Sequence, residues 1–152
     1  MITFLNKSDY HHLLTGRTPM ALNRLLLQEL KNEKINLTRE QLIILVALWE
    51  NDKCSQQMLA TATYRDKPST TRLIDNLEKA GFLIRKADPN DRRINLVYLT
   101  KEGKEIKEKS IAVINKVLAY AVDGISIEEL DVFKSCFDKI YANLEKKLND
   151  EK

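Results

Sequence analysis

Two adjacent arginines lie in a segment whose pattern is typical of the tip of a β-hairpin. Arg92 and Arg93 follow Asp-Pro-Asn-Asp at positions 88–91, and the runs on either side, 83–87 and 94–99, are short and strand-like. Guanidinium groups bind phosphates and base edges through a fixed fork of N–H donors. A hairpin tip is exposed to solvent, so a merely solvated pair of charges is the alternative interpretation.

Positive charge is concentrated in the middle third of the chain. From Lys53 to Lys101 there are ten lysines and arginines against five acidic residues, a net charge of +5, whereas the rest of the 152 residues carries −2. A local basic excess is the usual feature of a phosphate-binding surface. The charge distribution therefore favours an anionic partner for this segment.

Patterns for other chemistry are absent from the sequence. It contains no GxSxG, Walker-type loop, GxGxxG or HExxH, so an enzyme is not expected. His11 and His12 would diverge by about 100° on a helix and could not share one metal ion. Cys54 and Cys136 have no CxxC partner, which favours reduced thiols, with a redox sensor as the alternative. We therefore expect no cofactor and no metal.

Length and composition predict one ordinary folded domain. The 152 residues are 43% hydrophobic and 31% charged, and only four glycines and three prolines interrupt them, which favours long helices. No run approaches the ~18 apolar residues of a membrane span, and the first residues lack the pattern of a secretory signal. A cytoplasmic protein without a membrane partner is the expectation.

Three short helices are predicted ahead of the hairpin. Thr38 to Gln41 has the form of a capping box that opens the first helix, and Ser55 caps the second, whose Met58 is expected to point inward. The third begins at Pro68 and ends at Gly81. Spacing predicts that its buried stripe is Leu73, Leu77 and Ala80, which leaves Thr71, Arg72, Asp75 and Lys79 pointing away.

Longer helices are predicted at both ends of the chain. The first covers about Ser8 to Glu33 and is interrupted near Gly16, where Thr18 could cap a restart with Pro19 in its first turn. Thr100 caps another, and a second capping box, Ser126 to Glu129, opens the last.

The last helix carries an apolar seam on an otherwise charged surface. Its members are Phe133, Phe137, Tyr141 and Leu144. An exposed seam of this size favours association with a second chain, and burial within one chain is the alternative.

The order of three helices followed by a hairpin is that of a winged helix-turn-helix, a mainly α fold with a small β-hairpin wing. An exposed helix with small polar and basic residues in its first turns fits the major groove of DNA. An arginine on the neighbouring hairpin can enter the minor groove. A winged-helix protein-interaction module without DNA readout is the alternative.

Three stretches together resemble the MarR family of bacterial transcription regulators. They are SQQMLATAT, DKPSTTRLIDNLEKAGFLIR and DPNDRRINLVYLTKEGK, which start at residues 55, 66 and 88. The resemblance covers nearly the whole chain. It implies one intertwined domain, in which residues 1–33 and 104–152 form dimerisation helices and residues 34–103 form the winged helix-turn-helix DNA-binding region.

The resemblance also implies roles for individual residues. Arg93 would enter the minor groove, Asp91 would hold its guanidinium group, and Arg92 would contact phosphate. On the third helix, Arg72 is the predicted major-groove contact. The remaining predicted DNA contacts are Gln56, Gln57, Ser69, Thr70 and Thr71, of which Thr70 lies nearest the apolar side.

The partners implied by the resemblance are double-stranded DNA with an inverted repeat, a second copy of the chain, and a small aromatic or anionic ligand. The ligand would bind between the dimerisation and DNA-binding parts and release a repressor from its site. Members that sense peroxide carry a reactive cysteine in the first helical segment. The first segment of this chain has none, which is a departure from that branch.

Overall fold

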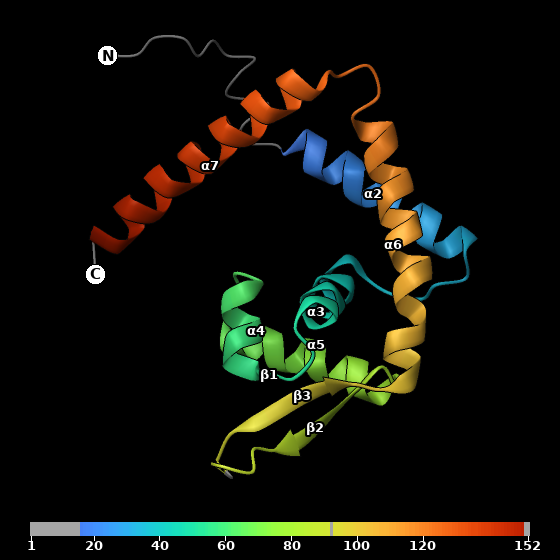
Figure 1. The fold of residues 1–152 in the computed structure, drawn as a ribbon, viewed down its shortest axis with the longest axis vertical. Coiled ribbons are helices and arrows are strands. Elements are labelled where there is room, and N and C mark those ends of the chain that lie inside the picture. The colour runs from blue at the N-terminus through green and yellow to red at the C-terminus, as the bar shows by residue number, and fades with distance from the viewer. Residues whose placement is uncertain (1–15, 92, 151–152) are drawn as a thin grey trace. The chain divides into compact units, whose positions relative to one another are not determined.

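The computed structural model describes residues 16–91 and 93–150 (Figure 1). The predicted helix start at Ser8, the His11–His12 pair and Arg92 lie outside these residues. The helices are α2 (Arg17–Asn32), α3 (Arg39–Glu50), α4 (Gln56–Ala62), α5 (Lys67–Lys79), α6 (Lys101–Ala121) and α7 (Ile127–Asp150). The strands are β1 (Cys54–Ser55), β2 (Leu83–Ala87) and β3 (Asn95–Leu99). The predicted mainly helical, winged fold is confirmed.

Two compact units make up the chain, one ending at Val117 and the other beginning at Leu118. The first holds the sheet and the helices from α2 to most of α6. The second holds the end of α6 and α7. Within the described residues, no helix is both long and apolar enough to cross a membrane.

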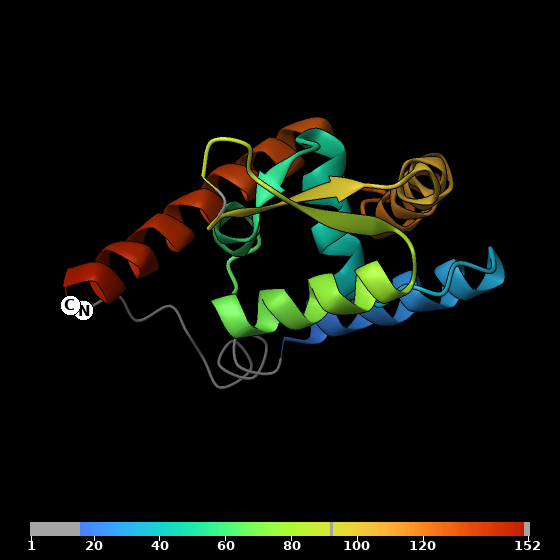
Figure 2. The ribbon, with the colours of Figure 1, turned by 90° about the horizontal axis from the view of Figure 1, so that it is seen from below.

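The sheet is antiparallel with the strand order β1-β3-β2. Leu83 of β2 pairs with Leu99, and Cys54 of β1 pairs with Val97. Figure 2 shows β2 and β3 beside α5, with the loop that joins them at the end of the hairpin. The sequence did not predict β1, because two residues are too few to show an alternating pattern and Ser55 is also the N-cap of α4.

The core of the first unit lies around α3 and α5. Its fully buried apolar side chains are Leu30, Ile44, Leu45, Leu48, Leu59, Ile74, Leu77, Leu83 and Val97. Met58 was expected among them, but its side chain is 57% exposed on a helix of only seven residues. Trp49 is half-buried, and its Nε1 donates to the carbonyl oxygen of Gly103 at 2.8 Å.

The buried stripe of α5 differs from the predicted one. Thr70, Ile74 and Leu77 are buried, whereas Leu73 is half-buried and Ala80 is exposed at the C-cap. The spacing of four and then three residues is the same, but the stripe starts from a threonine. Its hydroxyl donates to the Asp66 carbonyl at 2.9 Å, so burial leaves no unsatisfied polar group.

Most predicted helix starts are confirmed. Thr38 forms its capping box, Ser55 accepts the Met58 amide, and Ser126 exchanges hydrogen bonds with Glu129. Helix α5 begins at Lys67 with Asp66 as its N-cap, one residue before the predicted Pro68.

Two further helix starts involve Thr100 and Gly16. The Gly103 amide donates to the Thr100 hydroxyl at 3.0 Å, as expected of a cap for α6. Helix α2 begins at Arg17, so Thr18 lies inside it and is not its cap. Gly16 is the N-cap, with a left-handed φ of 59° that glycine adopts without strain.

Candidate nucleic-acid interface

Asp66 is the N-cap of α5. Its carboxylate accepts hydrogen bonds from the Ser69 amide at 2.8 Å and from the Ser69 hydroxyl at 2.7 Å. These bonds hold the pKa of Asp66 below its ordinary value. The sequence suggested that amides at this helix end are available to a phosphate. Both the amide and the hydroxyl of Ser69 are instead bonded to Asp66, so the exposed side chains of Lys67 and Arg72 are the cationic groups left for a phosphate at this end of the helix.

Thr70 does not fit its predicted role as a DNA contact. Its side chain is fully buried, and its hydroxyl is bonded to the Asp66 carbonyl. A buried hydroxyl cannot reach a base or a phosphate, so Thr70 supports the helix from the inside.

The exposed face of α5 carries Arg72. A shallow hollow beside it is lined by Arg65, Ser69, Arg72, Leu73 and Asn76. Arg65 and Asn76 were not predicted, although Asn76 follows Arg72 by one helical turn and so shares its face. Arg65 lies in the turn before α5, 3.8 Å from a carboxylate oxygen of Glu40.

Gln56 and Thr71 meet across the two helices of the helix-turn-helix. The Gln56 side-chain Nε2 donates to the Thr71 hydroxyl oxygen at 3.1 Å, and that hydroxyl donates to the Lys67 carbonyl at 2.9 Å. The bond fixes the orientation of the Gln56 amide. The structure thus joins two side chains that the sequence predicted only separately.

A second hollow, of about 370 Å³, lies between the wing and the starts of α4 and α5. It is lined by Ser55, Gln56, Gln57, Lys67, Arg93, Ile94 and Asn95. It brings together the predicted residues Gln56, Gln57 and Arg93. Lys67 and Asn95 were not predicted as site residues, although Lys67 directly precedes Pro68, the predicted start of the helix. The two cations on its rim suit an anionic phosphate.

The wing tip holds Arg93 close to Asp91. The Asp91 carboxylate accepts from the Arg93 amide at 3.0 Å and from its Nε at 3.2 Å, while the Arg93 side chain is 92% exposed. An exposed ion pair contributes little to stability, so its main effect here is to orient the guanidinium group. The two terminal nitrogens remain directed to solvent. Arg92 lies outside the described residues.

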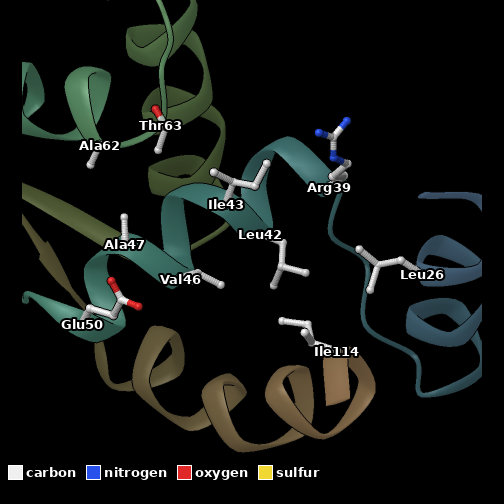
Figure 3. A pocket seen from close by; sticks show the side chains of 10 residues that line it. All are labelled: Leu26, Arg39, Leu42, Ile43, Val46, Ala47, Glu50, Ala62, Thr63 and Ile114. Carbon is white, nitrogen blue, oxygen red and sulfur yellow. The ribbon is translucent and has the colours of Figure 1, made fainter. Parts of the chain in front are cut away.

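A third hollow, of about 330 Å³, lies between α2, α3, the end of α4 and α6 (Figure 3). Its lining is mostly apolar and includes Leu26, Leu42, Val46 and Ile114, whose side chains point toward a common space in Figure 3. Arg39 and Glu50 lie at the two ends of α3 beside it. An apolar hollow with charged side chains beside it has the character of a small-molecule site.

The environment of Cys54 and the arrangement of metal-binding side chains bear on redox and metal chemistry within the described residues. Cys54 is buried, its Sγ donates to the Asn51 carbonyl at 2.8 Å, and burial together with the charge of Asp52 raises the pKa of its thiol. A protonated thiol is a poor nucleophile, which argues against a redox role for Cys54. Cys136 is exposed on α7. The described residues include no cluster able to hold a metal ion.

The winged region matches a family model. Residues 37–94, which run from the loop before α3 to the wing, match the model of the MarR family. A curated relative, the organic hydroperoxide resistance transcriptional regulator of Bacillus subtilis (strain 168), is 28% identical over 113 residues, which is 74% of each chain.

Two solved structures extend the likeness to the whole chain. A MarR protein from Peptoclostridium difficile has a TM-score of 0.82 at 25% identity and covers 100% of this chain and 97% of its own. A mutant MarR from E. coli in complex with operator DNA has a TM-score of 0.79 at 21% identity, covering 91% of this chain and 99% of its own. In its matched segment and in its fold, this chain is similar to transcription regulators of the MarR family, which are not enzymes.

Proposed function

We propose that this chain is a homodimeric, sequence-specific repressor that reads an inverted repeat and is released by a small aromatic or anionic ligand. The main support for DNA readout is that Arg72 on α5 and Arg93 on the wing are both exposed. The Asp91 carboxylate also orients the Arg93 guanidinium group. Each arginine lines a hollow that also holds a second cation and a side-chain amide, Arg65 and Asn76 beside Arg72, and Lys67 and Gln56 beside Arg93. In such a regulator, α5 contacts base edges in the major groove and the wing contacts the minor groove.

Dimerisation is assigned to residues 1–33 and 104–152, and DNA binding to residues 34–103. The support is the seam on α7, whose Phe133, Phe137, Tyr141 and Leu144 side chains are exposed by 59, 61, 43 and 59%. Soluble monomers rarely leave a continuous apolar patch of this kind in water. A twofold dimer would place two wings on a twofold DNA site, with half-site centres about one helical turn, or roughly 10 base pairs, apart.

Ligand release is assigned to the hollow beside α3 in Figure 3. It lies between α2 and α6, which belong to the proposed dimerisation part, and α3 and α4, which belong to the proposed DNA-binding part. A ligand that binds better when these helices are in a DNA-incompetent arrangement would weaken DNA binding by the same factor as DNA weakens ligand binding. Because chromosomal DNA is the target, we place the regulator in the cytoplasm.

The proposal is tested by selecting bound DNA from a random pool with the purified full chain, followed by affinity measurements at several salt concentrations. We expect a symmetric consensus and an affinity that falls steeply with salt, because phosphate contacts release counterions. Selected sequences without a consensus, or an affinity that hardly depends on salt, would instead favour a winged-helix protein-interaction module.

A further inference from the structure

Arg85 connects the wing to α5 through several hydrogen bonds. Its Nη1 donates to Glu78 Oε2 and its Nη2 to Asp75 Oδ1, both at 2.5 Å. Nη2 also lies 3.5 Å from the Thr71 carbonyl oxygen, and the Arg85 backbone amide donates to Glu78 Oε1 at 2.9 Å. One side chain on β2 therefore contacts three successive turns of α5.

The guanidinium group is held in an enclosed setting. The Arg85 side chain is only 19% exposed, and its Nε is buried without a hydrogen-bond partner among the described residues. A partly buried ion pair with a two-pronged donor is more directional than one in open solvent. The two carboxylates also lie on the same helix as Arg72, where unpaired negative charges would repel DNA phosphates.

The position of Arg85 suits control of the wing. It lies two residues before the end of β2, opposite Val97, on the same strand face as buried Leu83. Beyond it the chain enters the tip, where the Asp88 amide donates to the Ile94 carbonyl at 2.8 Å. The remaining contacts of the hairpin tip are local, so Arg85 is the nearest polar link between the tip and α5 among the described residues.

We propose that Arg85 is a positioning residue for DNA readout, which holds the wing at the angle to α5 that lets Arg93 and Arg72 bind neighbouring grooves at once. The proposal rests on the proposed function, because it requires Arg93 to contact DNA. Arg85 itself need not touch DNA. Its effect is to make the contribution of Arg93 depend on an intact link to Asp75 and Glu78.

A double-mutant cycle, with affinity measured for the selected DNA site, shows how far the contribution of Arg93 depends on Arg85. We expect Arg93→Ala to weaken binding by about tenfold in the native chain and by less than about twofold in an Arg85→Met background. Arg72→Ala is the matched control, and its fold-change should be the same in both backgrounds. Equal losses from Arg93→Ala in both backgrounds would overturn the positioning role while leaving the proposed function intact.

Hydrogen exchange of the DNA-free protein provides an independent readout. The Asp88 and Ile94 amides at the tip should exchange about tenfold faster in Arg85→Met, while amides of α3 remain protected. If Arg93→Ala costs nothing in the native chain, the assigned minor-groove contact is wrong, and so is the positioning role built on it. Unchanged tip exchange would overturn the link between Arg85 and the wing.

A second variant covers the case in which Arg85→Met does not fold. Asp75→Asn combined with Glu78→Gln keeps Arg85 and the side-chain shapes but removes both acceptor charges. In this variant too, Arg93→Ala should weaken DNA binding by less than about twofold. A native-like cycle in this variant would count against the proposal.

Discussion

Arg72 and Arg93 are both exposed arginines, and the proposed function assigns them to DNA grooves that carry different information. Base edges in the major groove present a distinct pattern of donors and acceptors for each base pair. We predict that Arg72→Ala costs about 1 to 3 kcal/mol on the preferred site and much less on random DNA. Repeating the random-pool selection with this variant checks the prediction, and an unchanged consensus would contradict it.

The wing arginine should behave differently, because the minor groove offers its width and negative potential more than a base code. We predict that Arg93→Ala weakens binding to all sequences and relaxes a preference for A·T-rich flanks, while the central consensus stays. Asp91→Ala should show part of the same loss, since it removes the carboxylate that orients Arg93. If the central bases change instead, the two arginines have been assigned to the wrong grooves.

The contribution of the Asp52 carboxylate to stability should depend on pH. Burial alone would raise the pKa of Asp52, but hydrogen bonds from the Leu99 and Lys53 amides and the ion pair with Lys104 outweigh it, so the pKa is lowered. A lowered pKa adds stability above the unfolded-state value, about 3.9, and this stability is lost as pH falls through the folded-state value.

The expected outcome is that Asp52→Asn is less stable than the native chain at pH 7 and that the difference shrinks as pH falls below about 4. Urea unfolding at a series of pH values measures it. A difference that stays constant down to pH 2 would mean that the charge of Asp52 is not what ties the loop before β1 to β3 and α6.

At the scale of elements, α7 carries the sharpest test of association. We predict that Phe137→Asp produces a monomer by sedimentation and weakens operator binding, because the second half-site is no longer held nearby. Phe133 packs against Phe137 with ring centroids 5.1 Å apart, so the charge would enter the centre of the seam. Lys139→Asp, two residues along the same helix, is the matched control and should remain dimeric. A monomeric Phe137→Asp that binds DNA unchanged would refute the role of the seam.

Local signals predicted the elements well where a side chain caps its own helix. Each of four side chains marks a helix start because it accepts a hydrogen bond from an amide only three residues away: Thr38, Ser55, Thr100 and Ser126. The predicted winged fold followed from the order of these elements. The buried stripe of α5 was misplaced because the prediction took Leu73 in place of Ile74 and listed Thr70 as a DNA contact, although Thr70 lay nearest the apolar side.

Contacts between elements were harder to predict. Strand β1 depends on a pairing with Val97 and Leu96, more than 40 positions along the chain, and has no local pattern of its own. The Gln56–Thr71 and Arg85–Asp75 contacts also join separate elements. Arg85 had one signal, since alternation from Leu83 places it on the inner face of its strand. The type and spacing of residues 88–93 were sufficient to predict that Arg93 lies at the hairpin tip beside Asp91, because that turn is local, whereas its contact with DNA stays a prediction.

For the whole molecule, the hollow beside α3 gives a testable link between ligand and DNA. We predict that Val46→Phe fills it, so that aromatic acids no longer weaken DNA binding while DNA affinity without ligand is preserved. Arg39→Gln should weaken the response to anionic ligands more than to neutral ones. Thermal shift and DNA affinity in a screen of phenolic acids check both, and a native chain that responds to no compound would leave the ligand assignment without support.

The junction of the wing and α6 depends on Gly103. A methyl group at this position would collide with the carbonyl oxygen of Phe82, and the Gly103 carbonyl already accepts from Trp49. If the proposed repressor function holds, a genetic screen for bacteria in which the target gene is permanently switched on should therefore recover alleles at position 103, which is on α6 and is not one of the proposed DNA contacts. Immunoblots would distinguish alleles that destabilise the fold from alleles that remove a DNA contact. Gly103 alleles should lower the amount of protein in the cell, and Arg72 or Arg93 alleles should not.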